Sequence, residues 1–461
     1  MKKNQCHSVL STIVAAIIAA FSPTAYSGEP PAQEKSELMK FFEQDYLFGT
    51  WGGLRTDLSK RGVDFEFLYI ASNPHNLSGG IDRGSVYQGA FLMLLDLDSQ
   101  KLAGFDGGHF HVSGVSLHGR DHFSDNHIGD LNKVNLIDFP NGSRLLELWY
   151  EQKFWDNKAS IKLGQLAVDQ DFLIAEFYNS LASINLLNQT FFFPTLAFNV
   201  YDIPGFPQGN HSLASTPYGA PGVRLRVDAT ERCYAQVAAY DGYPDQDNGT
   251  RVHLDSNEGA LLYFEVGYKL NQLPEDTGLP GNIKLGVFYH TDDFADNSSV
   301  FNAMLSLGPV TYHSGTYGFY GLLDQTLYRE KGKDDPARQG LVGFFRLTGA
   351  PGDRNLTTFG VDGGLVYKGL IPTRDWDSIA VAASYLKMSD DVADGQRMVN
   401  AAAPGTFAGI LDYEAVVEVT YKAQMTAWWT VQTSVQRAIH PGGSDANPDS
   451  WAFIIASTVR F

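Results

Sequence analysis

Most of the chain after Gly62 alternates apolar and polar residues with a period of two. One such segment reads Val223-Arg-Leu-Arg-Val-Asp228, with aliphatic residues on one parity and charged residues on the other. A second reads Ala415-Val-Val-Glu-Val-Thr-Tyr-Lys422 and repeats the arrangement. Successive side chains of a β-strand point to opposite faces, so this pattern predicts strands with one apolar face and one charged face.

The pattern predicts sixteen strands. Their expected positions are 62–72, 87–99, 107–119, 144–154, 159–168, 222–230, 232–241, 259–270, 282–291, 316–329, 339–350, 356–368, 378–388, 413–422, 427–437 and 451–461. An even number of strands is typical of a single-chain bacterial outer-membrane barrel. A barrel of this size leaves an aqueous bore rather than a packed interior.

Two all-β architectures share this alternation, a soluble β-sandwich and a transmembrane barrel. Three observations favour the barrel. Charges of both signs recur on the polar face, and the chain stops on a strand that ends in Phe461. Aromatic residues also gather near segment ends, as in an interfacial girdle: Tyr69, Tyr150, Tyr240, Tyr268, Tyr289, Tyr328, Tyr367, Tyr385, Tyr421, Trp428 and Trp429. We therefore predict an all-β fold, a transmembrane antiparallel β-barrel of about 16 strands with a short N-terminal helical segment.

The first residues are typical of an export signal. Lys2 and Lys3 precede an apolar run at 9–20, and small residues stand at Ala25 and Ser27, so cleavage is expected after Ser27. The run is too short to span a bilayer as a helix, and no later stretch reaches the necessary length. The expected organisation is a signal peptide at 1–27, a helical segment at 28–61 and the barrel at 62–461. Two short helices are expected in the second part, one after Ser36 and one at 54–60.

One long segment, 169–221, interrupts the rhythm of the strands. It contains the run Phe191-Phe-Phe-Pro194 and several further prolines, and it is too aromatic for a disordered region. Loops of this length in compact domains are usually functional. The pattern leaves two alternatives open: the segment folds into the bore and narrows it, or it forms an ordered external loop.

The formal charge of the chain is −18, and it becomes −20 once Lys2 and Lys3 are removed with the signal peptide. This balance argues against nucleic acid as a partner, because phosphate binding needs clustered basic residues. Cys6 lies in the signal peptide, which leaves Cys233 alone and without an intrachain disulfide partner. A lone thiol of this kind usually behaves as a small hydrophobic residue.

Several short motifs appear in a fixed order over most of the chain. They are Trp51-Gly-Gly-Leu-Arg-Thr-Asp-Leu58 with Arg61-Gly62, Gly107-Gly-His-Phe-His-Val-Ser-Gly114, Glu147-Leu-Trp-Tyr-Glu-Gln152, Gly164-Gln-Leu-Ala167, Pro221-Gly-Val-Arg-Leu-Arg226, Lys284-Leu-Gly-Val-Phe-Tyr-His290, Tyr317-Gly-Phe-Tyr320 with Asp324-Gln325, Asp353-Arg-Asn-Leu356, Tyr367-Lys-Gly-Leu370 and the stretch 432–443. In this order the chain resembles the OprB-like family of carbohydrate-selective porins.

The resemblance implies a water-filled outer-membrane channel that passes monosaccharides and related neutral solutes by diffusion. One departure stands after Gly164-Gln-Leu-Ala167, where the family favours a tight acidic cluster and this chain reads Val168-Asp-Gln-Asp171. If this region shapes the constriction, the sugar preference would differ from that of the family.

The predicted inward positions supply the candidate pore-lining and substrate-binding residues. They are Glu147, Trp149, Glu151, Arg224, Arg226, Lys284, Arg346, Asp362 and Glu418. Opposed charges across a bore set up a transverse field and offer donors and acceptors to sugar hydroxyls, while an aromatic ring supports the apolar face of a sugar. The alternative role for each of them is simply to solvate the lumen.

The sequence gives weaker indications of a metal site or a catalytic site. His109 and His111 share a strand face, but no cysteine or carboxylate pair in the sequence completes a metal site, so a lumen-facing pair is expected. No catalytic constellation stands out, and we expect neither an enzyme nor a cofactor. Expected partners are small neutral sugars, outer-membrane lipids and the barrel assembly machinery, with a homotrimer left open. The alternative functions are a general diffusion porin without sugar preference and an exported soluble carbohydrate-binding β-protein.

Overall fold

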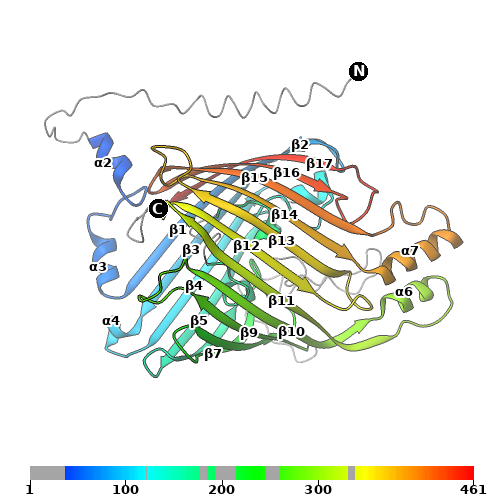
Figure 1. Ribbon diagram of the computed structural model, residues 1–461, viewed down its shortest axis with the longest axis horizontal. Coiled ribbons are helices and arrows are strands. Elements are labelled where there is room, and N and C mark those ends of the chain that lie inside the picture. Colours follow the sequence, from blue (N-terminus) through cyan, green and yellow to red (C-terminus); the bar gives the residue numbers. More distant parts are fainter. Residues whose placement is uncertain (1–36, 121, 177–183, 193–213, 245–258, 331–337) are drawn as a thin grey trace, which may run out of the picture. The chain divides into compact units, whose positions relative to one another are not determined.

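The computed structural model describes residues 37–120, 122–176, 184–192, 214–244, 259–330 and 338–461. Its strands form one seventeen-stranded antiparallel sheet (Figure 1). The strands are β1 (Val63–Ser78), β2 (Gly84–Ser85), β3 (Gln88–Asp98), β4 (Gly108–Gly119), β5 (Gly142–Phe154), β6 (Ala159–Leu166), β7 (Ala220–Asp228), β8 (Cys233–Asp241), β9 (Ala260–Leu270), β10 (Gly281–Ala295), β11 (Tyr312–Arg329), β12 (Gly340–Gly349), β13 (Thr357–Lys368), β14 (Ser378–Met388), β15 (Tyr413–Thr426), β16 (Trp429–Ile439) and β17 (Ser450–Arg460).

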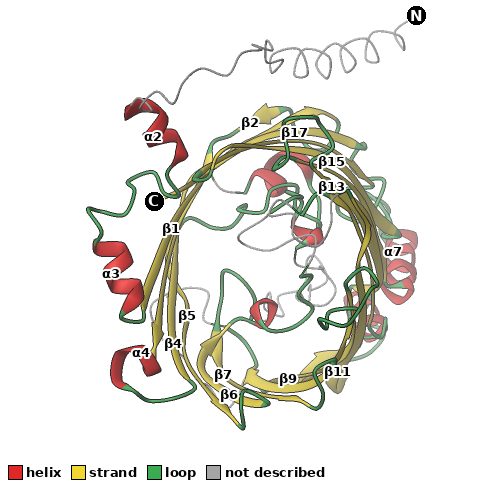
Figure 2. Ribbon diagram, turned by 60° about the vertical axis from the view of Figure 1, so that its left-hand side comes forward, coloured by secondary structure: helices red, strands yellow, loops and turns green. Residues whose placement is uncertain are grey.

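The sheet closes on itself because β1 pairs with both β3 and β17. The two-residue strand β2 is an extra pairing beside β1, so sixteen long strands form the wall (Figure 2). Each predicted strand position coincides with one of them, which confirms the predicted barrel. Closure leaves no sheet edge unpaired, which a bilayer requires of any β-structure that crosses it.

The two faces of the wall carry the predicted alternation. On β10 the side chains of Ile283, Leu285 and Val287 are exposed, whereas Lys284 and the residues of its parity are buried. Tyr268 is exposed near the end of β9, as expected for an aromatic girdle, and Tyr289 is exposed within β10. Tyr240 is a correction, because it is buried inside the barrel, where it packs edge-to-face on Tyr263.

The connections differ in length at the two ends of the barrel. Short turns lie between β5 and β6, β7 and β8, and β15 and β16, whereas the long connections at 120–141, 167–219 and 389–412 all lie at the opposite end. Bacterial outer-membrane barrels have short periplasmic turns and long extracellular loops. The end with long connections is therefore the extracellular end.

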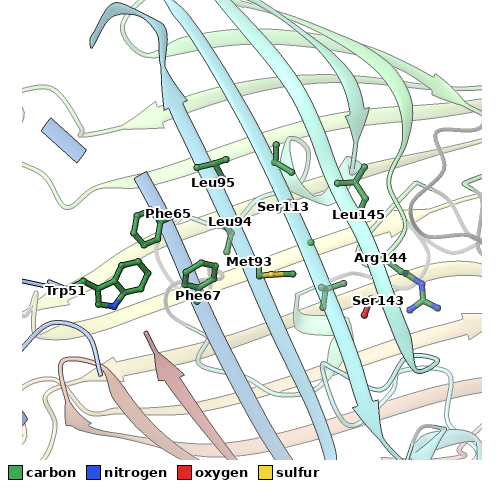
Figure 3. A pocket seen from close by; sticks show the side chains of 13 residues that line it. Trp51, Phe65, Phe67, Met93, Leu94, Leu95, Ser113, Ser143, Arg144 and Leu145 are labelled. Atoms are coloured by element: carbon green, nitrogen blue, oxygen red, sulfur yellow. The ribbon is translucent and has the colours of Figure 1, made fainter. Parts of the chain in front are cut away.

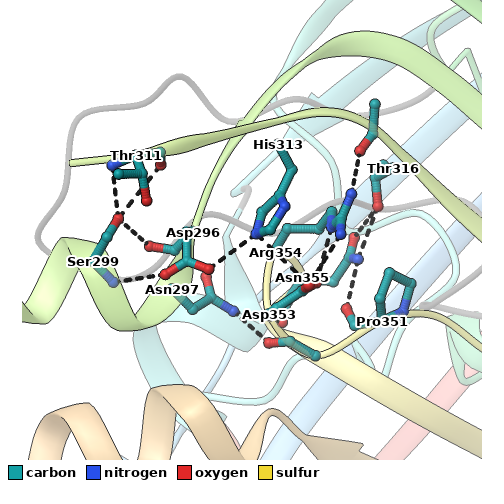
Figure 4. A network of polar contacts seen from close by, with 12 residues as sticks. Asp296, Asn297, Ser299, Thr311, His313, Thr316, Pro351, Asp353, Arg354 and Asn355 are labelled. Carbon is teal, nitrogen blue, oxygen red and sulfur yellow. Dashed lines mark hydrogen bonds and ion pairs between the residues drawn. The ribbon is translucent and has the colours of Figure 1, made fainter.

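Two extracellular helices, α6 (Asn297–Met304) and α7 (Asp390–Ala402), pack on each other through a buried cluster that includes Phe301, Val392 and Val399. A polar network ties the start of α6 to neighbouring connections (Figure 4). Asp296 caps α6 at the Ser299 amide (2.8 Å) and also bonds the His313 ring (2.9 Å). Arg354 pairs with Asp353 through two bonds of 2.8 and 2.9 Å.

Among the described residues, the remaining α-helices are α2 (Glu37–Glu43), α3 (Leu54–Lys60) and the short turn helix α4 (Ser99–Ala103). Three short helical turns, η1 (Ser124–Ile128), η2 (Val168–Gln170) and η3 (Gln189–Phe191), lie in the long connections. The predicted helix at 54–60 is thus present with the expected bounds. The predicted signal peptide at 1–27 lies outside the described residues. In the described part of the chain, no helix is both long and apolar enough to cross a membrane.

The two ends of the barrel sequence meet beside α3. Arg55 donates one hydrogen bond to the backbone oxygen of Phe461 (2.6 Å) and another to that of Phe65. The Phe461 amide donates to the Phe67 oxygen (2.9 Å), and its ring lies 5.5 Å from that of Phe48. The C-terminal residue is therefore held by both α3 and the first strand.

Candidate constriction inside the barrel

Two extracellular connections turn back into the barrel. We name residues 122–141 the first inner loop and the described parts of 167–219 the second inner loop. Figure 2 shows loop segments and short helices within the ring of strands. The second loop contains the buried residues Phe172, Leu186 and Phe191, which pack against the inner face of the wall. Of the two alternatives that the sequence left open for this segment, its described parts follow the inward one.

Carboxylates on distant strands hold the backbone of both loops. Glu418 on β15 accepts the amides of Leu187 (2.7 Å) and Asn188 (3.0 Å). Glu414, two inward positions away, accepts the amides of Leu131 (2.8 Å) and Asn132 (2.7 Å). Loop amides would otherwise be buried without partners, and an ionised acceptor forms a stronger bond than a neutral one.

Further carboxylates do the same on strands β9 and β11. Glu265 on β9 accepts the Leu173 amide (2.9 Å), and Asp324 on β11 accepts the Glu176 amide (2.6 Å). The described parts of the second inner loop are therefore fixed to β9, β11 and β15.

Two inward cations complete this set of anchors. Lys284 donates to the Ile174 carbonyl (2.7 Å) and pairs with Glu176 (3.0 Å). Arg346 pairs with Asp362 (2.8 Å) on the neighbouring strand and also donates to the Thr190 carbonyl. Four of the predicted pore residues, Lys284, Arg346, Asp362 and Glu418, thus surround and support the second inner loop.

The two inner loops also bind each other. The Asn188 side chain donates to the Asn132 carbonyl (2.8 Å), and the Gln189 amide donates to the Lys133 carbonyl (2.9 Å). Gln436 of β16 bridges them, since it accepts from Asn188 (3.0 Å) and donates to the Val134 carbonyl (2.8 Å). The loops form one joined partition inside the barrel.

A second group of predicted residues gathers on β5–β7. Arg224 pairs with Glu151 (2.8 Å) and donates to the Ser160 hydroxyl (2.6 Å). Lys162 pairs with Asp171 (2.6 Å) and lies 4.3 Å from the centre of the Trp149 ring. This cluster presents alternating charges beside an aromatic ring.

The other predicted residues border this cluster. Glu147 lies 3.9 Å from the His111 ring, which stacks on Trp149 at 4.9 Å. His111 and His109 both bond the same oxygen of Asp96 at 2.8 Å. Arg226 lies apart from the cluster, because its guanidinium pairs with Asp228 through two 2.9 Å bonds and covers the Tyr234 ring.

The segment Val168-Asp-Gln-Asp171 stands where the family favours a tight acidic cluster. Its two carboxylates have different partners. Asp171 faces Lys162, whereas Asp169 accepts the amide (2.8 Å) and the hydroxyl (2.7 Å) of Thr216 within its own loop. Burial raises the pKa of Asp169, and the bonds from Thr216 oppose that shift. Asp171 therefore belongs to the mixed-charge cluster on β5–β7, whereas Asp169 holds the conformation of the second inner loop.

Several other charged side chains also face inward but were not among the predicted pore-lining residues. They include Lys162, Glu265, Asp324 and Glu414. Lys162 lies between Ile161 and Leu163, so its parity alone marked it as inward. The loop residues that these side chains bind carry no comparable signal, because they contribute backbone groups.

Two cavities lie at the wall. One, of about 670 Å³, is on the outer face beside α3 and is lined by apolar residues that include Trp51, Phe67 and Met93 (Figure 3). The other, of about 770 Å³, lies at the periplasmic end and is lined by strands β11–β15 together with Glu176 and Asn185 of the second inner loop. Only the second opens on the polar face of the wall.

The sequence profile described as "Carbohydrate-selective porin, OprB family" matches residues 82–461. The chain belongs to the OprB family. Its relatives include Porin B of Pseudomonas aeruginosa, with 27% identity over 87% of this chain and 88% of that protein. The putative porin QuiX of Acinetobacter baylyi is 24% identical over 91% of this chain and 94% of that protein.

Solved structures agree with this assignment at the level of the fold. The high-pH structure of Pseudomonas putida OprB superimposes with a TM-score of 0.79 and 24% identity, over 91% of this chain and 99% of that chain. As an OprB family member, the protein is a carbohydrate-selective porin of a Gram-negative outer membrane. Its family is one of channels rather than enzymes.

Proposed function

We propose that the protein forms a water-filled channel through which monosaccharides and similar small neutral solutes diffuse passively, and that the two inner loops set the size limit. The observation that carries this proposal is the partition that both loops form across the interior, fixed to the wall by Glu265, Glu414 and Glu418. A channel narrowed by anchored loops discriminates by size and by the polar groups at the narrowing.

The nine predicted pore residues divide into two roles under this proposal. Lys284, Arg346, Asp362 and Glu418 act through the loops and shape the narrowing. The mixed-charge cluster on β5–β7 offers contacts to the solute through Glu147, Trp149, Glu151 and Arg224, and Arg226, which lies apart from this cluster, offers a further guanidinium. Guanidinium groups offer several fixed donors to hydroxyls, and an aromatic ring offers a flat apolar surface to a sugar.

Liposome swelling with solutes of graded size tests the proposal. We expect monosaccharides to enter much faster than disaccharides, and two monosaccharide isomers to enter at different rates. A general diffusion porin would pass sugars and amino acids of matched size equally, which is the outcome that contradicts carbohydrate selectivity.

A double variant, Arg224→Ala with Arg226→Ala, tests the cluster. We expect isomer discrimination to fall and ion preference to shift toward cations, because Glu151 and Asp171 lose the opposing guanidinium charge. Arg232→Ala is the matched control, since Arg232 is paired with Asp276 (2.6 Å) in the periplasmic turns. Equal isomer ratios and reversal potentials in both variants would place the selective contacts elsewhere.

The partners follow from the same proposal. The exposed aliphatic face contacts outer-membrane lipids, and the last strand, which ends in Phe461, is the segment that the barrel assembly machinery recognises. A homotrimer remains the alternative to a single barrel, and chemical crosslinking of the protein in its native membrane distinguishes them by mass.

A further inference from the structure

The apolar cavity of about 670 Å³ on the outer face of the wall, which we name the outer groove, follows one row of paired residues. Met93 on β3 pairs with Phe67 on β1 and with Gly114 on β4. Gly114 pairs in turn with Leu145 on β5. Figure 3 shows the side chains of Phe67, Met93 and Leu145 around the cavity. The row lies on the face of the wall that meets lipid.

Gly114 leaves a slot in the middle of the outer groove. Neighbouring strands lie about 4.8 Å apart, so the backbones of Met93 and Leu145, on either side of Gly114, are separated by roughly 10 Å. A Cβ atom at position 114 would lie 3.2 Å from the Arg144 carbonyl oxygen and 3.8 Å from the Met93 side chain, with no third atom within 4 Å. The slot therefore lies between two apolar side chains, and its shape suits one extended hydrocarbon chain.

Polar side chains follow the slot toward the extracellular end of the wall. Ser116, the next outward residue of β4, accepts a hydrogen bond from the hydroxyl of Ser143 on β5 (2.9 Å). His118 follows on the same face, and its Nε2 atom lies 2.9 Å from the Tyr69 hydroxyl. Tyr87 bonds that hydroxyl as well, and its side chain is exposed. We name these five residues the outer polar patch.

The outer polar patch begins within the height of the hydrocarbon layer. A barrel strand crosses this layer with about 9–11 residues, of which about five face the lipid. On β4 the outward positions are apolar only at Phe110, Val112 and Gly114, so Ser116 and His118 complete the five. A hydroxyl or an imidazole that meets only hydrocarbon leaves part of its hydrogen-bonding capacity unused, which costs free energy. A ligand with polar groups at this depth therefore suits the patch better than hydrocarbon does.

The separation between the slot and the patch matches one leaflet of the bilayer. Four residues separate Gly114 from His118, which is about 13 Å along the strand. Because barrel strands are tilted by about 40°, this is about 10 Å along the membrane normal. The hydrocarbon of one leaflet is about 15 Å thick, half of the whole layer. A chain attached to a headgroup at His118 therefore reaches Gly114 within the outer leaflet.

We infer that the outer groove and the outer polar patch together bind one glycolipid of the outer leaflet, with an acyl chain in the slot and the acylated sugar at the patch. Hydroxyl, phenol and imidazole groups both donate and accept hydrogen bonds, so they match the hydroxyls of a sugar headgroup. Lipid A, an acylated glucosamine disaccharide, has this chemistry. The site lies on the outer face and the solute path on the inner one, so it is independent of which solutes the channel selects.

The test is native mass spectrometry of the purified protein, stripped of lipid in detergent and then mixed with lipid A or with phosphatidylethanolamine at equal concentration. We expect the wild-type barrel to retain one lipid A in preference to phosphatidylethanolamine. Gly114→Leu fills the slot and should weaken lipid A binding about tenfold, the change expected when two methylene groups lose their apolar contacts. Ser116→Ala with Ser143→Ala leaves the slot open and should weaken lipid A binding about fivefold, as for the loss of one net hydrogen bond, while phosphatidylethanolamine binding stays the same.

Gly321→Leu is the matched control. Gly321 faces outward on β11, where a Cβ atom would lie 3.3 Å from the side chain of Leu285, and it is outside the outer groove. This variant adds the same side chain to another part of the lipid-facing wall and should bind lipid A as the wild type does. Heat-shift electrophoresis should show every variant folded, and the serine double variant tests the site without adding bulk to the wall.

Three outcomes would overturn the glycolipid site. Equal retention of the two lipids by the wild type would show that the patch does not recognise a sugar headgroup. Wild-type affinity for lipid A in both Gly114→Leu and the serine double variant would place any bound lipid elsewhere on the wall. A dimer mass that Gly114→Leu abolishes would assign the groove to a second copy of the chain instead.

Discussion

Replacing Glu418 with alanine removes the acceptor for two amides of the second inner loop. Glu418 is 0% exposed and accepts bonds from the amides of Leu187 and Asn188 and from the hydroxyls of Ser434 and Thr420. Each buried donor left unpaired costs about 1–3 kcal/mol, so two amides weaken loop docking by roughly 2–6 kcal/mol. The lower value already corresponds to about a thirtyfold change in the docking equilibrium.

The expected consequence of Glu418→Ala is a wider and noisier channel. The strand pairing of β15 with β14 and β16 does not involve the side chain, so the barrel itself should persist. Single-channel conductance should rise, and the ratio of disaccharide to monosaccharide swelling should increase. Glu418→Gln, which retains one acceptor oxygen, should lie between wild type and alanine.

Glu275→Ala is the control, because Glu275 has a side chain that is 68% exposed in the turn between β9 and β10. Its conductance and swelling ratio should equal those of wild type. If Glu418→Ala also leaves both quantities unchanged while the protein remains folded, the inner loops do not set the size limit, and the reasoning from the anchors is wrong.

Three further predictions concern assembly, pH and the extracellular helices. Phe461→Ala should lower membrane yield, because the Phe461 ring packs against the rings of Phe48 (5.5 Å between centroids) and Phe91 (6.2 Å), whereas the outward-facing Phe154→Ala should not; equal yields on heat-shift electrophoresis would contradict this. Burial and the neighbouring charges of Glu414 and Asp138 raise the pKa of Asp130 well above its usual range, so the folded first inner loop gains stability as pH falls through that raised pKa. The protection factors of the amides in this loop, which are the intrinsic exchange rates divided by the measured ones, should therefore be larger at pH 5 than at pH 8, and Asp130→Asn should abolish this difference in protection. Gly395→Ala places a methyl group about 2.0 Å from the Phe301 ring, which should destabilise the packing of α7 on α6 by about 1–3 kcal/mol and speed amide exchange in α7; unchanged exchange would refute the contact.

The wall of the barrel could be predicted from sequence because each strand follows one rule. Lipid outside and polar groups inside impose a period of two on every crossing, so Val223-Arg-Leu-Arg-Val-Asp228 identifies β7 without any tertiary information. Boundaries were less accurate where this constraint ends. β10 extends to Ala295 and β11 begins at Tyr312, beyond the predicted limits, because strand pairing continues where lipid no longer selects apolar residues.

The interior could be predicted only in part. Parity placed the side chains of Arg346, Asp362 and Glu418 on the inner face, yet it could not indicate that Arg346 and Glu418 bind the loop rather than open water. Glu418 meets the backbone of Leu187 and Asn188, and backbone groups are the same at every position of a sequence. The direction in which a loop folds thus depends on partners that the sequence pattern does not distinguish.

The contact between Arg55 and Phe461 has a consequence for how the barrel closes. The wall is sealed by the pairing of β1 with β17, and the guanidinium that bonds the terminal residue stands just ahead of β1. The bond from Arg55 to Phe461 therefore joins the segment that leads into the first strand to the end of the last one, at the same seam where the pairing of these two strands closes the wall.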